Sequence, residues 1–551
     1  MTYGFMRAIA LLAVASLTAC VGPGGIGRDG PSPIEEQLLA EIALERGDYR
    51  TAVNKYLYVA RSSRDVDYAR RATALAWDYG FDAHALSAVE RWLELDPEDV
   101  AAHGYRVRLA TRFGRTDDAL ESLNMYLGDP AMRRDADYVL LATDLLTAPR
   151  QAAELFTRLE ADFPESAGIQ RSLAELTAQT GDVAAAIGYA RKTIALRPDW
   201  NSTRAWFARL LLLNDERSSA YEQMAFALER EPGVEYELEF VRLLVAAEEF
   251  ESAAERLQRV AERYPDEPAV TLVGAALLTE AGRRDEATAL YGAMRRAGNC
   301  RSECYWNLGA LAYDRGDYAE AIELFRNVGP GARLESAVIA ESQTRFAMGE
   351  TDAAIAVLET FATDYPKRRF AVTETKASLQ SVAGRHDEAV ETSMLALEYQ
   401  PWNESVWLAH GAILEQAGRM DSALEAFRRA WEIAPQRSTT QNAYGYTLAL
   451  TTTRYAEAEA LIAAALEQDP QNPAIMDSMG WVLFRQGRLA QARVWLEQAW
   501  QLMADPEIAA HLVELLWSVD EPEAATALLD EAAALFPDSP ALQDVRERVT
   551  R

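Results

Sequence analysis

Positive charge is scarce in this sequence. Lysine and arginine together number 55 against 85 aspartates and glutamates, which gives a formal net charge of −30. Only four of the cationic residues are lysines: Lys55, Lys192, Lys367 and Lys376. Nucleic acids and anionic membrane surfaces carry the same negative sign. The balance therefore disfavours non-specific binding to nucleic acid and makes any membrane contact dependent on an anchor.

Residue types that hold metals or carry out catalysis are also sparse. The five histidines are scattered, with no pair at metal-ligand spacing: His84, His103, His386, His410 and His511. The sequence contains no G-x-S-x-G element, no P-loop and no C-x-x-C pair. We predict that the protein is not an enzyme and that it requires no metal and no cofactor.

The apolar run nearest the N-terminus, residues 8–19, is too short to cross a membrane. Its 12 residues cannot span ~30 Å of hydrocarbon as a helix. Arg7 precedes the run and small residues close it, which is typical of a secretory signal peptide. We therefore predict a cleavable signal peptide over residues 1–19.

Residues Leu17-Thr18-Ala19-Cys20 resemble the bacterial lipobox. The resemblance implies cleavage before Cys20 and acylation of that cysteine, and several acyl chains together anchor a protein stably. In lipoproteins of this kind, an aspartate directly after the acylated cysteine resembles a signal for retention in the inner membrane. This sequence has Val21 at that position. The resemblance therefore implies an outer-membrane lipoprotein that faces the periplasm. The alternative is an ordinary signal peptide with an incidental cysteine. The glycine- and proline-rich residues 20–32 are expected to form a flexible tether.

An alanine recurs at a fixed period along nearly the whole chain. Every gap between successive members is 33, 34 or 35 residues. The members are Ala52, Ala85, Ala119, Ala152, Ala186, Ala220, Ala253, Ala287, Ala321, Ala354, Ala389, Ala423, Ala458, Ala492 and Ala525. Repeat units of this length account for almost all of the chain after the tether and leave no span for a separate catalytic domain.

Residues 404–435 show the pattern of one unit most clearly. The motif W-x2-HG-x2-L lies on one face of a first helix, which is expected to end at Gly418. The motif A-x3-F-x2-A repeats this spacing on a second helix, which Pro435 prevents from continuing. The residues Gly411 and Ala423 are small, and larger side chains would hold the two helices apart.

These motifs resemble the tetratricopeptide repeat. The resemblance implies an all-α fold, in which about 15 helix-turn-helix units form a solenoid with the path of a right-handed superhelix over residues 33–539. Residues 540–551 are expected to form a C-terminal capping helix. The units around Ala152, Ala220 and Ala253 depart from the pattern because they lack the turn glycine.

Two cysteines remain besides Cys20, and both lie where one unit passes to the next. Cys300 follows the end of a unit that lacks the usual terminal proline, and Cys304 opens the next first helix. An oxidising periplasm permits disulfides, and removal of the lipidated cysteine leaves an even pair. We predict a disulfide between Cys300 and Cys304 that holds this turn in place. Two free thiols are the alternative.

The resemblance also implies a protein-binding groove along the first helices. The residues of this sequence at groove positions are Trp306, Tyr313, Asp314, Asn442, Tyr446, Asp477, Trp481, Phe484, Arg485, Glu514 and Trp517. Aromatic and arginine side chains most often carry interface energy, and Trp481, Phe484 and Arg485 share one face of one helix. The alternative is that the aromatic residues fill contacts between repeats.

A closer resemblance covers residues 442–489 and 506–517, and DSMGW at 477–481 is its most specific part. These stretches are similar to outer-membrane repeat lipoproteins that act as adaptors for periplasmic carboxyl-terminal processing proteases. The resemblance implies a lipid-anchored adaptor that presents peptidoglycan hydrolases to such a protease. A scaffold for cell-envelope assembly or polysaccharide export is the alternative. Both roles imply protein partners and attachment to a membrane through lipid, without nucleic acid.

Overall fold

The structure, a computed structural model, describes residues 32–265 and 267–550. Within these ranges the chain forms 31 α-helices, one short 3-10 helix, η1 (Pro130–Met132), and no β-strand. The first 30 α-helices form fifteen consecutive pairs, and one single helix follows them. The predicted all-α solenoid of two-helix units is therefore confirmed.

The first helix of each pair has an even number and the second an odd number. The first five pairs are α2 (Pro33–Glu45) with α3 (Tyr49–Ser62), α4 (Val66–Asp78) with α5 (Asp82–Leu95), α6 (Val100–Arg112) with α7 (Thr116–Leu127), α8 (Asp135–Asp144) with α9 (Pro149–Asp162), and α10 (Ala167–Gln179) with α11 (Val183–Leu196). The next five are α12 (Asn201–Leu213) with α13 (Arg217–Arg230), α14 (Val234–Ala246) with α15 (Phe250–Arg263), α16 (Pro268–Glu280) with α17 (Arg284–Arg296), α18 (Ser302–Asp314) with α19 (Tyr318–Arg326), and α20 (Leu334–Ala347) with α21 (Thr351–Asp364). The last five are α22 (Phe370–Val382) with α23 (His386–Tyr399), α24 (Glu404–Gln416) with α25 (Met420–Ile433), α26 (Ser438–Thr451) with α27 (Tyr455–Gln468), α28 (Pro473–Arg485) with α29 (Leu489–Leu502), and α30 (Pro506–Ser518) with α31 (Pro522–Leu535). The single helix α32 (Pro540–Thr550) follows, and it packs against α30.

The periodic alanines lie on the second helix of every pair. Each of them is at most 1% exposed, so the period in the sequence marks the positions where the helices approach most closely. In the pair α24–α25, a Cβ added to Gly411 would lie 2.4 Å from Cε1 of Phe427. The prediction that Gly411 and Ala423 are small because the helices are close is therefore confirmed.

Most units turn from the first helix to the second through a residue with positive φ, five positions before the periodic alanine. Glycine usually occupies this position, as at Gly418, where φ is 72°. Asp215 and Glu248 replace it in two of the units that lack a turn glycine, with φ of 60° and 62°, and Asp520 does so in the last pair with 62°. A side chain with a Cβ is strained in this conformation. These three units therefore keep the same turn geometry at a cost in stability, whereas the Ala152 unit has no residue with positive φ at its turn.

Replacing Glu248 with glycine should stabilise the pair α14–α15 by about 1 kcal/mol, because glycine adopts positive φ without steric cost. Urea unfolding followed by circular dichroism, with hydrogen exchange to localise the change, measures the effect. Glu251→Gly, in the first turn of α15, is the control and should destabilise the helix by about 0.5–1 kcal/mol. A lower unfolding midpoint for Glu248→Gly would contradict the prediction.

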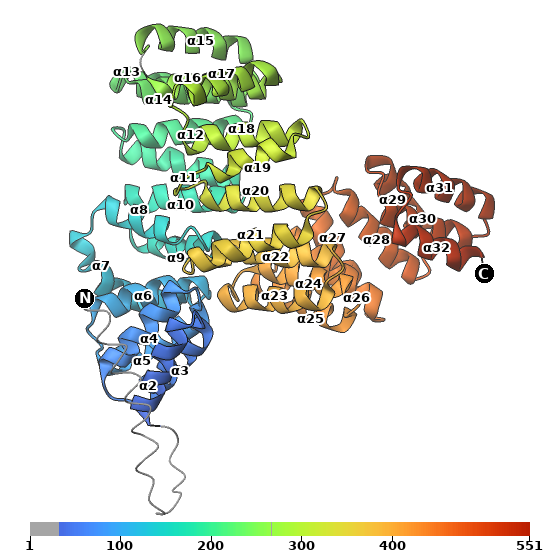
Figure 1. Ribbon diagram of the computed structural model, residues 1–551, viewed down its shortest axis with the longest axis horizontal. Coiled ribbons are helices and arrows are strands. Elements are labelled where there is room, and N and C mark those ends of the chain that lie inside the picture. The colour runs from blue at the N-terminus through green and yellow to red at the C-terminus, as the bar shows by residue number, and fades with distance from the viewer. Residues whose placement is uncertain (1–31, 266, 551) are drawn as a thin grey trace, which may run out of the picture.

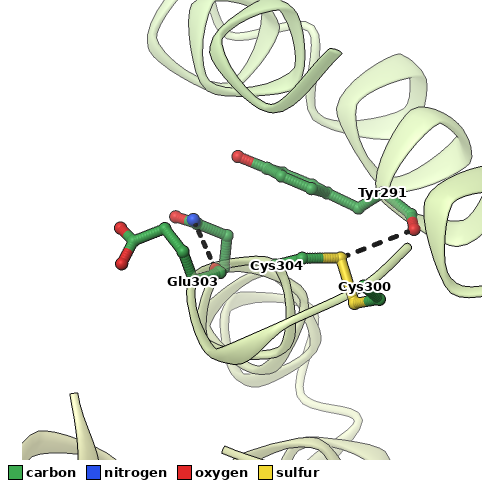
Figure 2. The surroundings of a disulfide bond; sticks show 5 residues. Tyr291, Cys300, Glu303 and Cys304 are labelled. Atoms are coloured by element: carbon green, nitrogen blue, oxygen red, sulfur yellow. Dashed lines mark hydrogen bonds between the residues drawn. A yellow bond between two sulfur atoms is a disulfide. The ribbon is translucent and has the colours of Figure 1, made fainter. Parts of the chain in front are cut away.

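Cys300 and Cys304 form a disulfide at the junction of α17 and α18 (Figure 2). Their Cα atoms lie 5.2 Å apart. Cys304 is buried, and its Sγ lies 3.8 Å from the carbonyl oxygen of Tyr291 on α17. The bond ties the loop after α17 to the first turn of α18, at a junction that has no proline to stiffen it.

The path of the pairs leads away from the first helices and then returns beside them (Figure 1). Trp402, between α23 and α24, donates a hydrogen bond from Nε1 to Oδ2 of Asp82 at 2.8 Å, although the two residues are 320 positions apart. Asp82 also accepts from Nη1 of Arg112 at 2.8 Å and is only 3% exposed. We call this meeting of α3–α6 with the segment 367–402 the cross-turn contact.

Arg369 lies at the centre of a second part of the cross-turn contact. Its guanidinium carbon is 4.8 Å, 5.3 Å and 5.0 Å from the ring centroids of Tyr49, Phe81 and Tyr399. Two ion pairs also join the segments: Lys367–Asp78 at 2.6 Å and Arg50–Glu398 at 2.8 Å. Aromatic, cationic and hydrogen-bonding contacts therefore hold the first units directly against units in the middle of the chain.

None of the helices in the two described ranges is long and apolar enough to cross a bilayer. The predicted signal peptide (1–19), Cys20 and the tether up to residue 31 lie outside these ranges. The lipid anchor therefore stays a prediction from the sequence.

Candidate protein-binding site in the C-terminal units

A cluster of polar and aromatic side chains lies on consecutive first helices near the C-terminus. Asn442 on α26, Asp477 on α28 and His511 on α30 follow one another at intervals of 35 and 34 residues, which is one repeat period. The first helices of neighbouring units contact one another here, so residues one period apart come together. We define the C-terminal cluster as Glu415, Tyr446, Asp477, Trp481, Glu507 and His511.

The imidazole of His511 is held by residues from two other helices. Its Nδ1 lies 2.9 Å and 3.0 Å from the two carboxylate oxygens of Asp477. The ring of Trp481 stacks on it with 4.2 Å between centroids and 25° between planes. The hydroxyl of Tyr446 lies 3.4 Å from Nε2. A neutral imidazole can thus donate to Asp477 from Nδ1 and accept from Tyr446 at Nε2.

The protonation of His511 depends on its burial and on Asp477. Burial lowers the pKa of His511, but the charge and hydrogen bond of Asp477, with smaller contributions from Glu507 and Glu514, raise this pKa above its ordinary value of 6.5. Burial, followed by the charge of Asp477, also raises the pKa of Tyr446, whose hydroxyl therefore stays protonated. A protonated His511 neutralises Asp477 and also offsets part of the charge of Glu507.

Glu415 and Glu507 are the two glutamates of the cluster. Within residues 32–265 and 267–550, neither side chain forms an ion pair with a lysine or arginine. Glu415 is half-buried and Glu507 is exposed, yet surrounding protein desolvates both groups. This desolvation, with a smaller effect of Glu507 on Glu415, raises the pKa of each carboxyl above its ordinary value of 4.5, although the charge of His511 partly opposes the shift at Glu507. The cluster therefore presents accessible negative charge in a partly dehydrated setting, which suits a cation.

The predicted residues on the rest of α28 pack mainly against the protein itself. Trp481 is 5% exposed, and its ring stacks on Phe484 with 5.3 Å between centroids. Arg485 donates from Nη2 to the hydroxyl of Tyr455 at 3.1 Å. The burial of Trp481 fits the alternative that this aromatic residue fills a contact between helices, and the binding role of the set stays a prediction.

Three further predicted residues lie around the cluster with different exposure. Asn442 is half-buried, and its Oδ1 is buried without a partner in the described chain. Glu514 accepts a hydrogen bond from Nη1 of Arg548 on α32 at 2.7 Å. Trp517 is 41% exposed, so it is the predicted aromatic residue of these units that remains most open to a partner.

The predicted residues of the Ala321 unit line a separate cavity. Trp306, Tyr313 and Asp314 on α18 border a space of about 210 Å³ together with residues of α20. Trp306 packs on Phe325 with 5.5 Å between ring centroids, whereas Tyr313 is 40% exposed. The structure therefore does not bring these residues into the C-terminal cluster.

Sequence reasoning missed His511, Glu415 and Glu507 as members of the cluster. His511 was grouped with the other histidines, although its distance from Asp477 is one period and could have revealed the pair. Glu415 and Glu507 have no such relation to Asp477, so their approach depends on side-chain directions that the period does not specify.

The described ranges contain no group of three or more histidine, cysteine, aspartate or glutamate residues that could hold a metal ion. His410 has a packing role, since its Nδ1 lies 2.8 Å from Oγ of Ser393 and burial lowers its pKa. His103 is likewise engaged, with Nε2 2.8 Å from the carbonyl oxygen of Pro97. The chemistry that the C-terminal cluster offers is therefore the binding of a positively charged group.

Several family models match parts of this chain. A model described as the Cytochrome c-type biogenesis protein H TPR domain matches residues 392–507. Three models of the tetratricopeptide repeat (TPR) match residues 148–199, 302–328 and 483–549. A model of the bacterial transcriptional activator domain matches residues 339–437.

Known proteins are similar to this chain over long stretches. The TPR repeat-containing protein PA4667 of Pseudomonas aeruginosa is 27% identical over 515 residues, which cover 87% of this chain and 81% of that protein. A solved tetratricopeptide repeat protein from Parabacteroides merdae is 14% identical, with 45% of this chain and 99% of that chain covered and a TM-score of 0.38. A chain of the APC/C hetero-tetramer Cut9-Hcn1 is 14% identical, with 95% and 97% covered and a TM-score of 0.36.

Proposed function

We propose that this chain, which is a tetratricopeptide-repeat protein, is a protein-binding scaffold whose C-terminal cluster binds a cationic segment of a partner. The repeats imply protein partners. The observation that carries the cationic assignment is the pair Glu415 and Glu507, which are accessible, partly desolvated and unpaired with any lysine or arginine of the described chain. An arginine or lysine side chain of the partner supplies the missing charge, and Tyr446 offers an adjacent aromatic ring.

Binding of a short arginine-containing peptide to the full chain tests this proposal. Fluorescence anisotropy compares that peptide with one carrying glutamine in place of arginine. We expect Glu415→Gln combined with Glu507→Gln to weaken binding about tenfold, which corresponds to about 1.4 kcal/mol. The control combines Glu229→Gln with Glu255→Gln, two exposed carboxylates on α13 and α15, and should change binding by less than about twofold. Equal losses in both double variants would overturn the assignment.

The affinity for the arginine-containing peptide should increase as the pH rises from about 5 to about 8. The raised pKa values mean that the free protein holds protons on Glu415 and Glu507 more readily than ordinary glutamates do. A bound cation favours the ionised carboxylates and disfavours protonated His511, so binding releases protons. Titrations at several pH values in buffers of constant ionic strength measure this trend. An affinity that falls with rising pH would contradict the cationic site.

We further propose that the scaffold is anchored by acylated Cys20 to the outer membrane and faces the periplasm. There it serves as an adaptor that holds a carboxyl-terminal processing protease and presents peptidoglycan hydrolases to it. The resemblance of residues 442–489 and 506–517 to such adaptors supports this role, and every member of the C-terminal cluster except Glu415 lies in these stretches. Tethering protease and substrate on one array would raise the effective concentration of substrate at the protease.

Three observations on cells test the adaptor role. Cys20→Ala should move the protein from the membrane to the soluble fraction, and affinity purification of the native protein should recover a protease together with cell-wall hydrolases. Loss of the gene should let those hydrolases accumulate. Unchanged hydrolase levels, with recovery of export or envelope-assembly components in place of a protease, would favour the assembly scaffold.

A further inference from the structure

A cavity of about 400 Å³ lies between the first and the middle units, beside the cross-turn contact. The turn from α2 to α3 forms one wall, and α21, α22 and α23 form the others. Its lining contains apolar side chains, among them Leu358, Val372 and Leu395, together with the rings of Tyr49 and Tyr399. The cavity is remote in sequence from the C-terminal cluster and shares no residue with it.

The charges that line this cavity are mainly positive, in contrast to the chain as a whole. Arg46, Arg369 and Lys376 border it with a single carboxylate, Glu359. Lys376 is paired with Glu359 at 2.6 Å. Neither Arg46 nor Arg369 forms an ion pair with any carboxylate in residues 32–265 and 267–550. One cavity thus has two arginines without anionic partners in a protein whose net charge is −30.

Two other acidic groups on α23 and at the start of α3 have partners of their own. Asp48 is the N-cap of α3 and accepts a hydrogen bond from the backbone N–H of Thr51. Its charge also attracts Arg369, without an ion pair between them. Glu398 pairs with Arg50 at 2.8 Å. Arg369 is also held in position by the three rings described above, and its Nε is buried without a partner. A guanidinium held in place without an ion pair is pre-organised to bind an anion.

We infer that this cavity binds a small amphiphilic anion, a carboxylate or phosphate group joined to an apolar chain. The anionic group contacts Arg46 and Arg369, and the apolar chain lies along the wall that contains Leu358, Val372 and Leu395. Because Arg46 belongs to the first unit and Arg369 to the middle of the chain, the bound anion bridges the two sides of the cross-turn contact. Ligand binding therefore stabilises the cross-turn contact.

Isothermal titration calorimetry of the full chain carrying Cys20→Ser tests this site with four probes: octanoate, octyl phosphate, inorganic phosphate and octanol. We expect octanoate and octyl phosphate to bind at least about tenfold more tightly than inorganic phosphate or octanol, because only the first two supply both charge and apolar surface. The tighter of the two anions identifies the headgroup. Binding should weaken at high salt, since the attraction is partly electrostatic.

Three arginine variants decide whether the anion occupies this cavity. Arg46→Gln and Arg369→Gln should each weaken octanoate binding at least about fivefold, and Arg46 is exposed, so its variant keeps the fold even if Arg369→Gln does not. Arg259→Gln on α15, an exposed arginine far along the chain, is the control and should leave binding unchanged. Binding that survives Arg46→Gln and Arg369→Gln, octanol binding as tight as that of octanoate, or no binding by either anion would overturn the inference. None of these outcomes affects the cationic-peptide test.

Discussion

Replacing Asp82 with alanine is expected to separate the first units from the middle units at a cost of about 3 kcal/mol. Asp82 accepts hydrogen bonds from Trp402 and Arg112 at 2.8 Å each and is nearly inaccessible to water. Burial raises the pKa of Asp82, which reflects how poorly this carboxylate is solvated. Its removal leaves the half-enclosed guanidinium of Arg112 without a counter-charge, and that loss is the main reason for the large effect.

Small-angle scattering and urea unfolding measure this result. We expect a larger radius of gyration for Asp82→Ala and faster hydrogen exchange in residues 66–112 and 367–416. Trp402→Phe keeps an aromatic ring but removes one hydrogen bond, so it should cost only about 1 kcal/mol. Asp352→Ala, which removes an exposed ion pair with Arg385, is the control and should cost less than about 1 kcal/mol. Unchanged scattering and stability for Asp82→Ala would show that the cross-turn contact does not hold the path closed.

Replacing Gly411 with alanine is expected to destabilise the pair α24–α25 by about 1–3 kcal/mol, because the added methyl group has no room. An ideal Cβ at this position would lie 2.4–2.8 Å from three atoms of the Phe427 ring. That ring is buried and cannot swing away without disturbing its own neighbours. Urea unfolding, with hydrogen exchange to localise the loss, measures the effect.

A matched glycine separates this steric effect from helix propensity. Gly188 lies inside α11, and an added Cβ there would meet nothing within 4 Å. Gly188→Ala should therefore stabilise its helix by about 0.5–1 kcal/mol. Adding Phe427→Leu to Gly411→Ala should recover part of the lost stability, because the smaller side chain makes room. Equal changes in stability for Gly188→Ala and Gly411→Ala would show that close packing is not the reason for the glycine.

The sequence specified the repeated contacts well because they recur in many units. The periodic alanines, and the pairing of Gly411 with Phe427, follow from neighbour-to-neighbour packing, which the same spacing reports many times. Degenerate turns are harder to recognise, since Asp215 and Glu248 adopt the geometry of glycine without its chemical signature. The period also predicts that Asp477 and His511 lie close together, because they are one repeat apart.

Contacts made only once could not be predicted in this way. Asp82 and Trp402 meet although 320 residues separate them. In a solenoid the small rotation between neighbouring repeats accumulates along the array. No spacing within one repeat reports the accumulated angle. The cavity beside Arg46 and Arg369 has the same origin. Its walls come from the first unit and from units in the middle of the chain, so the sequence of neither part alone indicates the cavity.

In an ordinary solenoid each repeat contacts only its neighbours, so a terminal repeat can unfold with the loss of a single interface. The contact between Asp82 and Trp402 closes part of this array into a ring. The second unit therefore packs against α23 in the middle of the chain as well as against the units before and after it. Unfolding from the N-terminal end must then break two interfaces at once, whereas the helices from α28 onward contact mainly their neighbours along the array. The protein is therefore expected to be mechanically asymmetric, with a stiff base at its N-terminal side and a more compliant arm that carries the C-terminal cluster.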